Sequence, residues 1–141
     1  MIIDKFLQVS DAQAVTVSAA STDVIDFGQA NPDTGMDCLS MMVIVTRVAA
    51  AAAGAATVTF SVQDSADNVT FTDVAVTAAI GKAALVAGSQ IVIPMPTKLR
   101  RYCRVYYTVG TGPLTAGTFS AQIVTGIQQN VPKPDSPRIA W

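Results

Sequence analysis

Apolar and polar residues alternate along several short segments of this chain. In residues 57–62, Val58, Phe60 and Val62 alternate with residues that carry small hydroxyl groups. Residues 101–109 alternate in the same way. Because successive side chains of a β-strand point to opposite faces, a period of two predicts strands with one buried face.

Strand-like segments recur at short intervals, and turn residues such as those of 31–35 (Asn-Pro-Asp-Thr-Gly) separate them. Such spacing is typical of an all-β sandwich. We therefore predict an all-β fold, a β-sandwich of about eight strands. The predicted strands are residues 14–18, 22–27, 39–48, 57–62, 71–77, 90–93, 101–109 and 118–125.

The length of 141 residues fits a single domain, 1–141. Within it we expect extended N- and C-terminal arms, residues 1–10 and the proline-rich residues 128–141. The alanine-rich residues 49–56 are too short for a stable helix and predict a loop at the end of the sandwich.

The chain carries little charge. Charged residues make up 13% of it, with a net charge of -1, against about 25% charged residues in typical domains. A nucleic-acid-binding protein needs an excess of basic residues, so no nucleic-acid partner is expected. A surface this poor in charge predicts that partners cover much of it. The N-terminal residues lack the pattern of a signal peptide, and no run approaches the length of a membrane span, so no membrane partner is expected.

The composition also argues against catalysis. The chain contains no His and no Glu, whereas most enzymes use His, Glu or Cys as acid, base or nucleophile. Cys38 and Cys103 lie in apolar runs and predict two reduced, buried thiols, with a disulfide between them as the alternative. Residues 64–68 (Asp-Ser-Ala-Asp-Asn) faintly resemble a calcium loop but favour a polar turn. We expect no enzyme activity, no cofactor and no metal.

One basic cluster stands out. It consists of Lys98, Arg100, Arg101 and Arg104, interleaved with Tyr102, Tyr106 and Tyr107. Interleaved basic and aromatic residues can bind nucleic acid. In a slightly acidic chain the pattern instead favours contact with a protein partner or internal ion pairs.

Both termini carry apolar residues that no turn signal ties to the sandwich. Ile2, Ile3, Phe6 and Leu7 precede the first predicted strand, and Trp141 ends the chain. A terminal Trp gains nothing from exposure to water, so we expect the arm to dock on the protein's own body or on a neighbour.

Several stretches are similar to a known family. They are residues 1–13, 20–26, 63–68 with Phe71-Thr72, 99–102 with Val105 and Tyr107, and the turn at 110–117. These residues resemble the Bbp16-like capsid cement proteins of tailed bacteriophages. The resemblance implies a jelly-roll sandwich that decorates the outer surface of an HK97-type capsid. Such a protein associates with itself and bridges neighbouring major capsid protein subunits, and the family offers no catalytic residue to carry over.

The expected partners are therefore the major capsid protein and the protein itself, as a homodimer in preference to a trimer. The expected location is the outer capsid surface of the virion, after assembly in the bacterial host cytoplasm. The alternatives are a receptor- or carbohydrate-binding jelly roll of a phage tail or fibre, and a ring-forming head-completion or tail-tube protein. We expect deletion of residues 1–8 or 128–141 to weaken capsid attachment. The predicted contact residues are Ile2, Ile3, Phe6, Leu7, Arg100, Arg101, Tyr102, Arg104, Tyr106, Pro132, Pro134 and Trp141.

Overall fold

The computed structural model of the protein describes residues 4–32, 39–51 and 54–126. These residues form ten strands and two short 3-10 helices. In chain order the elements are η1 (Lys5–Leu7), β1 (Gln8–Ala14), β2 (Ala19–Ala20), β3 (Ile25–Asp26), β4 (Leu39–Ala51), β5 (Thr57–Ser65), β6 (Thr72–Val76), β7 (Ile80–Gly81), η2 (Lys82–Ala84), β8 (Gln90–Pro94), β9 (Tyr102–Gly110) and β10 (Leu114–Thr125).

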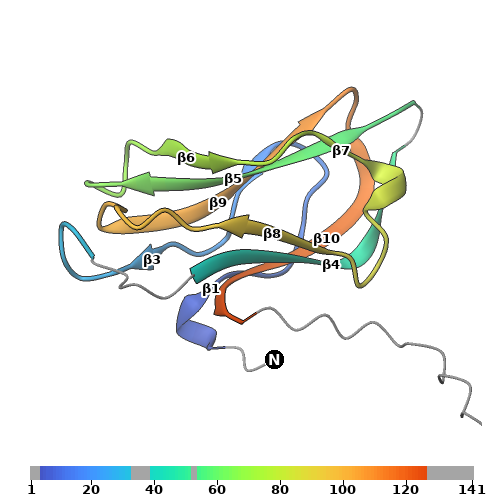
Figure 1. The fold of residues 1–141 in the computed structure, drawn as a ribbon. Coiled ribbons are helices and arrows are strands. Elements are labelled where there is room, and N and C mark those ends of the chain that lie inside the picture. The colour runs from blue at the N-terminus through green and yellow to red at the C-terminus, as the bar shows by residue number, and fades with distance from the viewer. Residues whose placement is uncertain (1–3, 33–38, 52–53, 127–141) are drawn as a thin grey trace, which may run out of the picture.

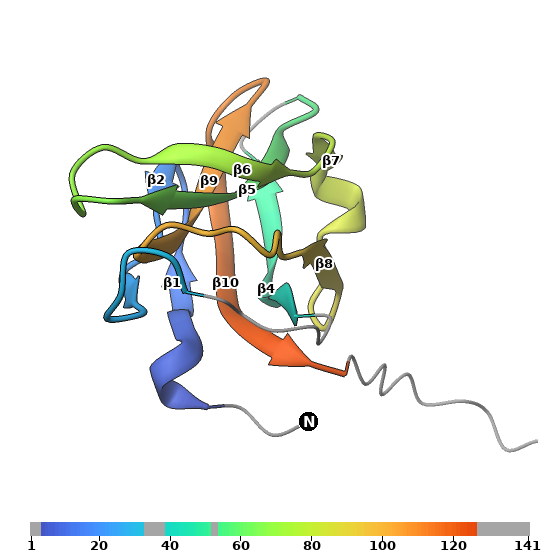
Figure 2. The same cartoon turned by 60° about the vertical axis from the view of Figure 1, so that its left-hand side comes forward.

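The strands form two antiparallel sheets that stack as two layers (Figure 1). Sheet A has the order β1-β10-β4-β8. Sheet B has the order β2-β9-β5-β6, with β3 also paired to β9 and β7 also paired to β5. In Figure 1 sheet B lies above sheet A, and Figure 2 shows β1, β10 and β4 side by side.

The strand order is that of a jelly roll. β2 and β3 occupy one position beside β9, and β6 and β7 occupy one position beside β5. The chain therefore has eight strand positions, of which the first, eighth, third and sixth form sheet A. The second, seventh, fourth and fifth form sheet B. This double Greek key confirms the predicted all-β sandwich of about eight strands.

Three aromatic rings fill the centre between the sheets. Phe60 of β5 contacts Tyr107 of β9 edge-on, with 5.8 Å between ring centroids, and contacts Phe119 of β10 at 5.4 Å. Tyr107 stacks on Phe119 at 5.6 Å. All three side chains are fully buried, and the Tyr107 hydroxyl donates to Ser10 Oγ of β1 at 2.8 Å. The cluster therefore joins both strands at the middle of sheet B to two strands of sheet A.

The first strand begins earlier than the sequence suggests. An extended arm was predicted over residues 1–10, but η1 occupies Lys5–Leu7 and β1 starts at Gln8, so that prediction is wrong for these residues. β1 shows no clean alternation because its register against β10 shifts twice. Ala12, at the second shift, has φ of 46°, a conformation that disrupts the regular period.

Two other strand predictions near the N-terminus are too long. Residues 15–18 form no strand, because the Ser18 side chain takes the place of a backbone partner and accepts from the Val109 N–H at 2.9 Å. The predicted strand at 22–27 is reduced to β3. Here the Ser21 hydroxyl accepts from the Val105 N–H at 3.2 Å. Side-chain hydrogen bonds of this kind compete with the regular ladder.

Two strands are longer than predicted. β4 runs to Ala51, so the predicted loop over 49–56 is wrong for its first residues. β10 begins at Leu114, whereas the sequence predicts a strand only from 118. Three register shifts between Leu114 and Phe119 hide the alternation in this part of the pair.

The aromatic cluster gives a direct test of the packing. Phe119→Ala removes a fully buried ring and should lower the free energy of unfolding by about 3–5 kcal/mol, measured by urea denaturation. Phe6→Ala is the matched control, because the Phe6 side chain is 90% exposed, and it should change stability by less than about 0.5 kcal/mol. Equal effects of the two substitutions would contradict the assigned core.

Candidate interaction surfaces

Strand β9 divides the predicted basic and aromatic cluster between two faces. Cys103, Val105 and Tyr107 point into the core, whereas Tyr102, Arg104 and Tyr106 alternate with them and lie on the outer face of sheet B. Tyr107 is therefore a core residue. The Cys103 thiol is free, and burial raises its pKa to about 12, so it is an unreactive thiol. Cys38 lies outside the described residues.

Arg100 forms an ion pair with the buried carboxylate of Asp64, while the Arg100 side chain itself is 38% exposed. Its Nε and Nη2 donate to Asp64 Oδ1 at 2.9 and 2.5 Å, and its backbone N–H donates to Asp64 Oδ2 at 3.0 Å. Nη2 also donates to the Asp64 carbonyl and to Thr72 Oγ1. Arg100 thereby fastens the segment before β9 to the end of β5.

The environment of Asp64 fixes its charge. The residue is only 3% exposed, and this burial alone would raise the pKa of the carboxyl. The hydrogen bonds from Arg100 and Thr72, together with the positive charge of Arg100, outweigh burial and lower the pKa of Asp64 below its usual value. The carboxylate is therefore ionised at neutral pH and stabilises the fold.

Arg101 forms a second ion pair, at the surface. Its Nε and Nη2 donate to the two carboxylate oxygens of Asp26 in β3, at 2.7 and 2.9 Å. The pKa of Asp26 is lowered, first by these bonds and then by the Gly28 N–H, which donates to the same carboxylate. The Arg101 guanidinium also lies 5.1 Å from the centre of the Tyr102 ring. The side chains of Arg101 and Asp26 are each about two-fifths exposed, so their ion pair contributes little to stability.

Arg104 has a different set of partners. Its Nε donates to Gln63 Oε1 at 2.8 Å, and the amide nitrogen of Gln63 donates to Asp73 Oδ1 at 2.9 Å. The guanidinium carbon of Arg104 lies 3.7 Å above the Phe71 ring and 6.0 Å from the Tyr106 ring. Partial burial lowers the pKa of Arg104 without removing its charge.

We call Phe71, Tyr102, Arg104 and Tyr106 the sheet B patch. Its three aromatic rings and one arginine are the residue types that most often dominate protein interfaces. Phe71 was not among the predicted contact residues. Its place beside Arg104 depends on the pairing of β5 with both β6 and β9, which residue spacing alone does not reveal.

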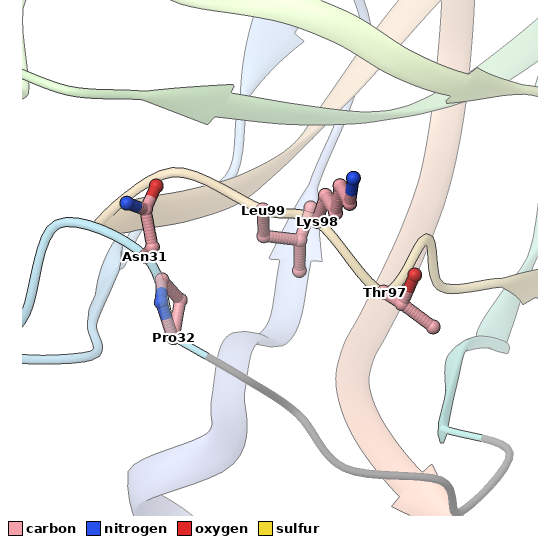
Figure 3. A pocket seen from close by; sticks show the side chains of 5 residues that line it. All are labelled: Asn31, Pro32, Thr97, Lys98 and Leu99. Atoms are coloured by element: carbon pink, nitrogen blue, oxygen red, sulfur yellow. The ribbon is translucent and has the colours of Figure 1, made fainter.

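Lys98 forms no ion pair with the described carboxylates. It lines a pocket of about 450 Å³ with Asn31, Pro32, Thr97 and Leu99, in which Pro32 and Leu99 are buried (Figure 3). These described lining residues include one cation, one amide and one hydroxyl, but no carboxylate, imidazole or thiol. Such a set can hold a small polar group.

Of the predicted N-terminal contact residues, Phe6 is exposed and Leu7 is packed against the body of the protein. Asp4 Oδ1 accepts from the Phe6 N–H at 2.9 Å and so caps η1, which leaves the Phe6 ring 90% exposed. Leu7 is half-buried and lines a small apolar pocket with Leu39, Ile123 and Val124. The predicted contact residues Ile2, Ile3, Pro132, Pro134 and Trp141 lie outside the described residues.

The turn after β5 has the geometry of a capped turn. Asp67 Oδ1 accepts from the N–H groups of Thr70 and Val69 and from the Ser65 hydroxyl, which together lower the pKa of Asp67 to about 2. Asn68 has φ of 59°, which Asn tolerates better than most residues. Across residues 4–32, 39–51 and 54–126, no three acidic or thiol side chains gather into a possible metal site.

Comparison with known protein families identifies the chain. The Bbp16 family model matches residues 9–123, a region that begins in β1, ends in β10 and includes both sheets. The chain belongs to the Bbp16 family. This family is associated with bacteriophages. A comparison with curated protein sequences gave no match. In the described part of the chain, neither helix has the length and apolar character needed to span a bilayer.

The two ion pairs should respond differently to substitution. Asp64→Asn should lower the free energy of unfolding at pH 7 by about 1–2 kcal/mol, because it weakens the charge-assisted hydrogen bonds of a buried carboxylate whose arginine partner is partly screened by solvent. Asp26→Asn, the surface control, should cost less than about 1 kcal/mol.

The pH dependence follows from the lowered pKa of Asp64. Its contribution to stability is present above the pKa of the unfolded chain, about 4, and is lost as the pH falls through the lower folded value. Urea denaturation at several pH values should therefore show the difference between wild type and Asp64→Asn shrinking below about pH 4. A difference that stays constant down to pH 2 would contradict the ion pair.

Proposed function

We propose that this protein is a capsid cement protein, which binds the outer surface of an HK97-type phage capsid and stabilises contacts between major capsid protein subunits. The observation that carries the proposal is the Bbp16 family match across both sheets of a jelly roll. The proposed role is structural, without catalysis or a cofactor. The proposed partners are the major capsid protein and further copies of this chain.

The charge distribution supports this role. The described ion pairs use Asp64 and Asp26 to bind Arg100 and Arg101, so much of the predicted basic cluster is neutralised within the chain. Arg104 remains, held by an amide and aromatic rings. A surface of this kind has little attraction for nucleic acid, and its rings and single arginine suit a protein partner.

The positions of the chain ends also support the proposal. Asp4 and Leu7, at the start of the described chain, line one small pocket with Val124 and Thr125, at the end of β10. Figure 1 shows η1 and the end of β10 at the same side of the sandwich. The described chain therefore begins and ends at neighbouring points of the body. Residues beyond these two points are proposed to contact the same boundary between capsid subunits.

Many weak contacts suffice on a symmetric shell. When a protein is held at several points, each further contact forms within an already bound complex, and the overall attachment becomes stronger without a large interface. The Phe6 ring and the sheet B patch would each supply a modest contact, and the arms would supply more.

The Phe6 contact can be tested by sedimentation with capsids. Shells assembled from the major capsid protein are mixed with purified protein, and the bound fraction is measured after pelleting. Phe6→Asp should weaken binding about tenfold, because it places a charge where an exposed aromatic ring is expected to be buried in the complex. Deletion of residues 1–7, which stops before β1, should weaken it further.

Val17→Asp is the matched control, because Val17 is also exposed but lies near Leu114 at the opposite end of the sandwich. It should bind shells as the wild type does. Absence of binding by the wild type, together with binding to host cells or isolated tails, would contradict the proposal and favour a receptor-binding module.

A further inference from the structure

The outer face of sheet B holds an arginine without a carboxylate partner in the described chain. Arg104 lies on this face between Tyr102 and Tyr106, because alternate residues of β9 point the same way. Arg100 and Arg101 form ion pairs with described carboxylates, whereas Arg104 forms none. A guanidinium keeps its charge at any physiological pH, so the positive charge of Arg104 is left without a matching anion in the described chain.

The Arg104 side chain is held in place from two sides. Its Nε donates to Gln63 Oε1 at 2.8 Å, and its guanidinium carbon lies 3.7 Å from the centre of the Phe71 ring. Gln63 is fixed in turn, because its amide nitrogen donates to Asp73 Oδ1 at 2.9 Å. An arginine that is already ordered loses little side-chain freedom when a partner binds to it.

The polar groups around this arginine have unused hydrogen-bonding capacity. Of the Arg104 nitrogens, only Nε donates to a described residue, so both Nη groups remain free there. The hydroxyl groups of Tyr102 and Tyr106 likewise bind no described residue. All three residues are half-buried, and partial burial lowers the pKa of Arg104. Further burial of such groups is costly unless the partner completes their hydrogen bonds.

The geometry of the guanidinium favours a carboxylate as the ligand. Because Gln63 occupies Nε, the two Nη groups form the remaining fork, whose N–H bonds match the two oxygens of a carboxylate. A sugar would need an open ring face on which to stack. The Arg104 guanidinium covers one face of Phe71, and the Arg101 guanidinium lies 5.1 Å from the centre of the Tyr102 ring. The rings therefore support cations and are poorly placed for a sugar.

We propose that Arg104 binds an Asp or Glu carboxylate of the major capsid protein through its two Nη groups. This inference rests on the proposed function, since it names the chemistry of one contact between the protein and the shell. Tyr102 and Tyr106 lie on either side of Arg104 along β9, so their hydroxyl groups can donate to the same segment of the partner. On docking, the rings would exclude water from the ion pair and so strengthen it.

A binding cycle on assembled shells tests this pairing. Shells of the major capsid protein are used untreated, or after carbodiimide and excess methylamine have converted their surface carboxylates to amides. Arg104→Gln should bind untreated shells about tenfold more weakly than the wild type or worse, because charge-assisted hydrogen bonds are lost. On amidated shells the wild type and Arg104→Gln should bind equally, because the pair is then already broken from the other side. The bound fraction is measured after pelleting.

Two further variants control for charge and for folding. Arg47→Gln removes an exposed arginine of β4, in the other sheet, and should bind each kind of shell as the wild type does. Arg104→Lys keeps the charge but lacks the fork, so it should weaken binding to untreated shells about threefold or more. Urea denaturation shows whether each variant is folded. If Arg104→Gln is not, Arg104→Lys takes its place in the cycle.

The possible contrary results are distinct. If folded Arg104→Gln binds untreated shells as the wild type does, the inference is wrong and the proposed function stands. If Arg104→Gln loses the same factor on untreated and amidated shells, Arg104 binds a group other than a carboxylate and the inference is again wrong. Binding to a glycan array by the wild type but not by Arg104→Gln would make this a sugar site instead. Absence of wild-type binding to untreated shells would contradict the proposed function and this inference together.

Discussion

The contact between Phe60, Tyr107 and Phe119 holds the two sheets of this jelly roll together. Phe60 and Tyr107 lie on adjacent strands of sheet B, and Phe119 lies on β10, which pairs with both β1 and β4 in sheet A. The Tyr107 hydroxyl, hydrogen-bonded to Ser10, adds a polar link to β1 inside the same core. The irregular edge strands depend on this centre, because β2 and β3 are too short to be stable without β9.

Two of the arginines near β9 form ion pairs within the described part of the chain. Asp64 and Asp26 bind Arg100 and Arg101, and the half-buried sheet B patch adds aromatic rings around Arg104. The resulting surface is poor in net charge but rich in groups that pack well against another protein. This distribution suits a component that makes repeated, modest contacts on a symmetric shell, which is the role that we propose.

Sequence reasoning succeeded where the local pattern matched the final environment. The alternation in residues 57–62 predicted β5, which pairs regularly with β9 along those residues. The short strand predicted at 90–93 is β8, which pairs regularly with β4. The same reasoning failed for β1, where two register shifts remove the period, and for residues 15–18, where a serine side chain replaces backbone partners. Sequence reasoning also did not predict the ion pair between Arg100 and Asp64. The two residues are 36 positions apart, and only the register of β5 against β9 brings them together.

The central claim is that this protein is a repeated component of the capsid shell. Its most direct test is the number of copies per virion, measured by quantitative mass spectrometry against the major capsid protein in purified phage particles. The cement role predicts a ratio near one to one, or a simple fraction of it set by the symmetry of the lattice. A handful of copies per particle would contradict this role and would place the protein in a tail, fibre or portal structure.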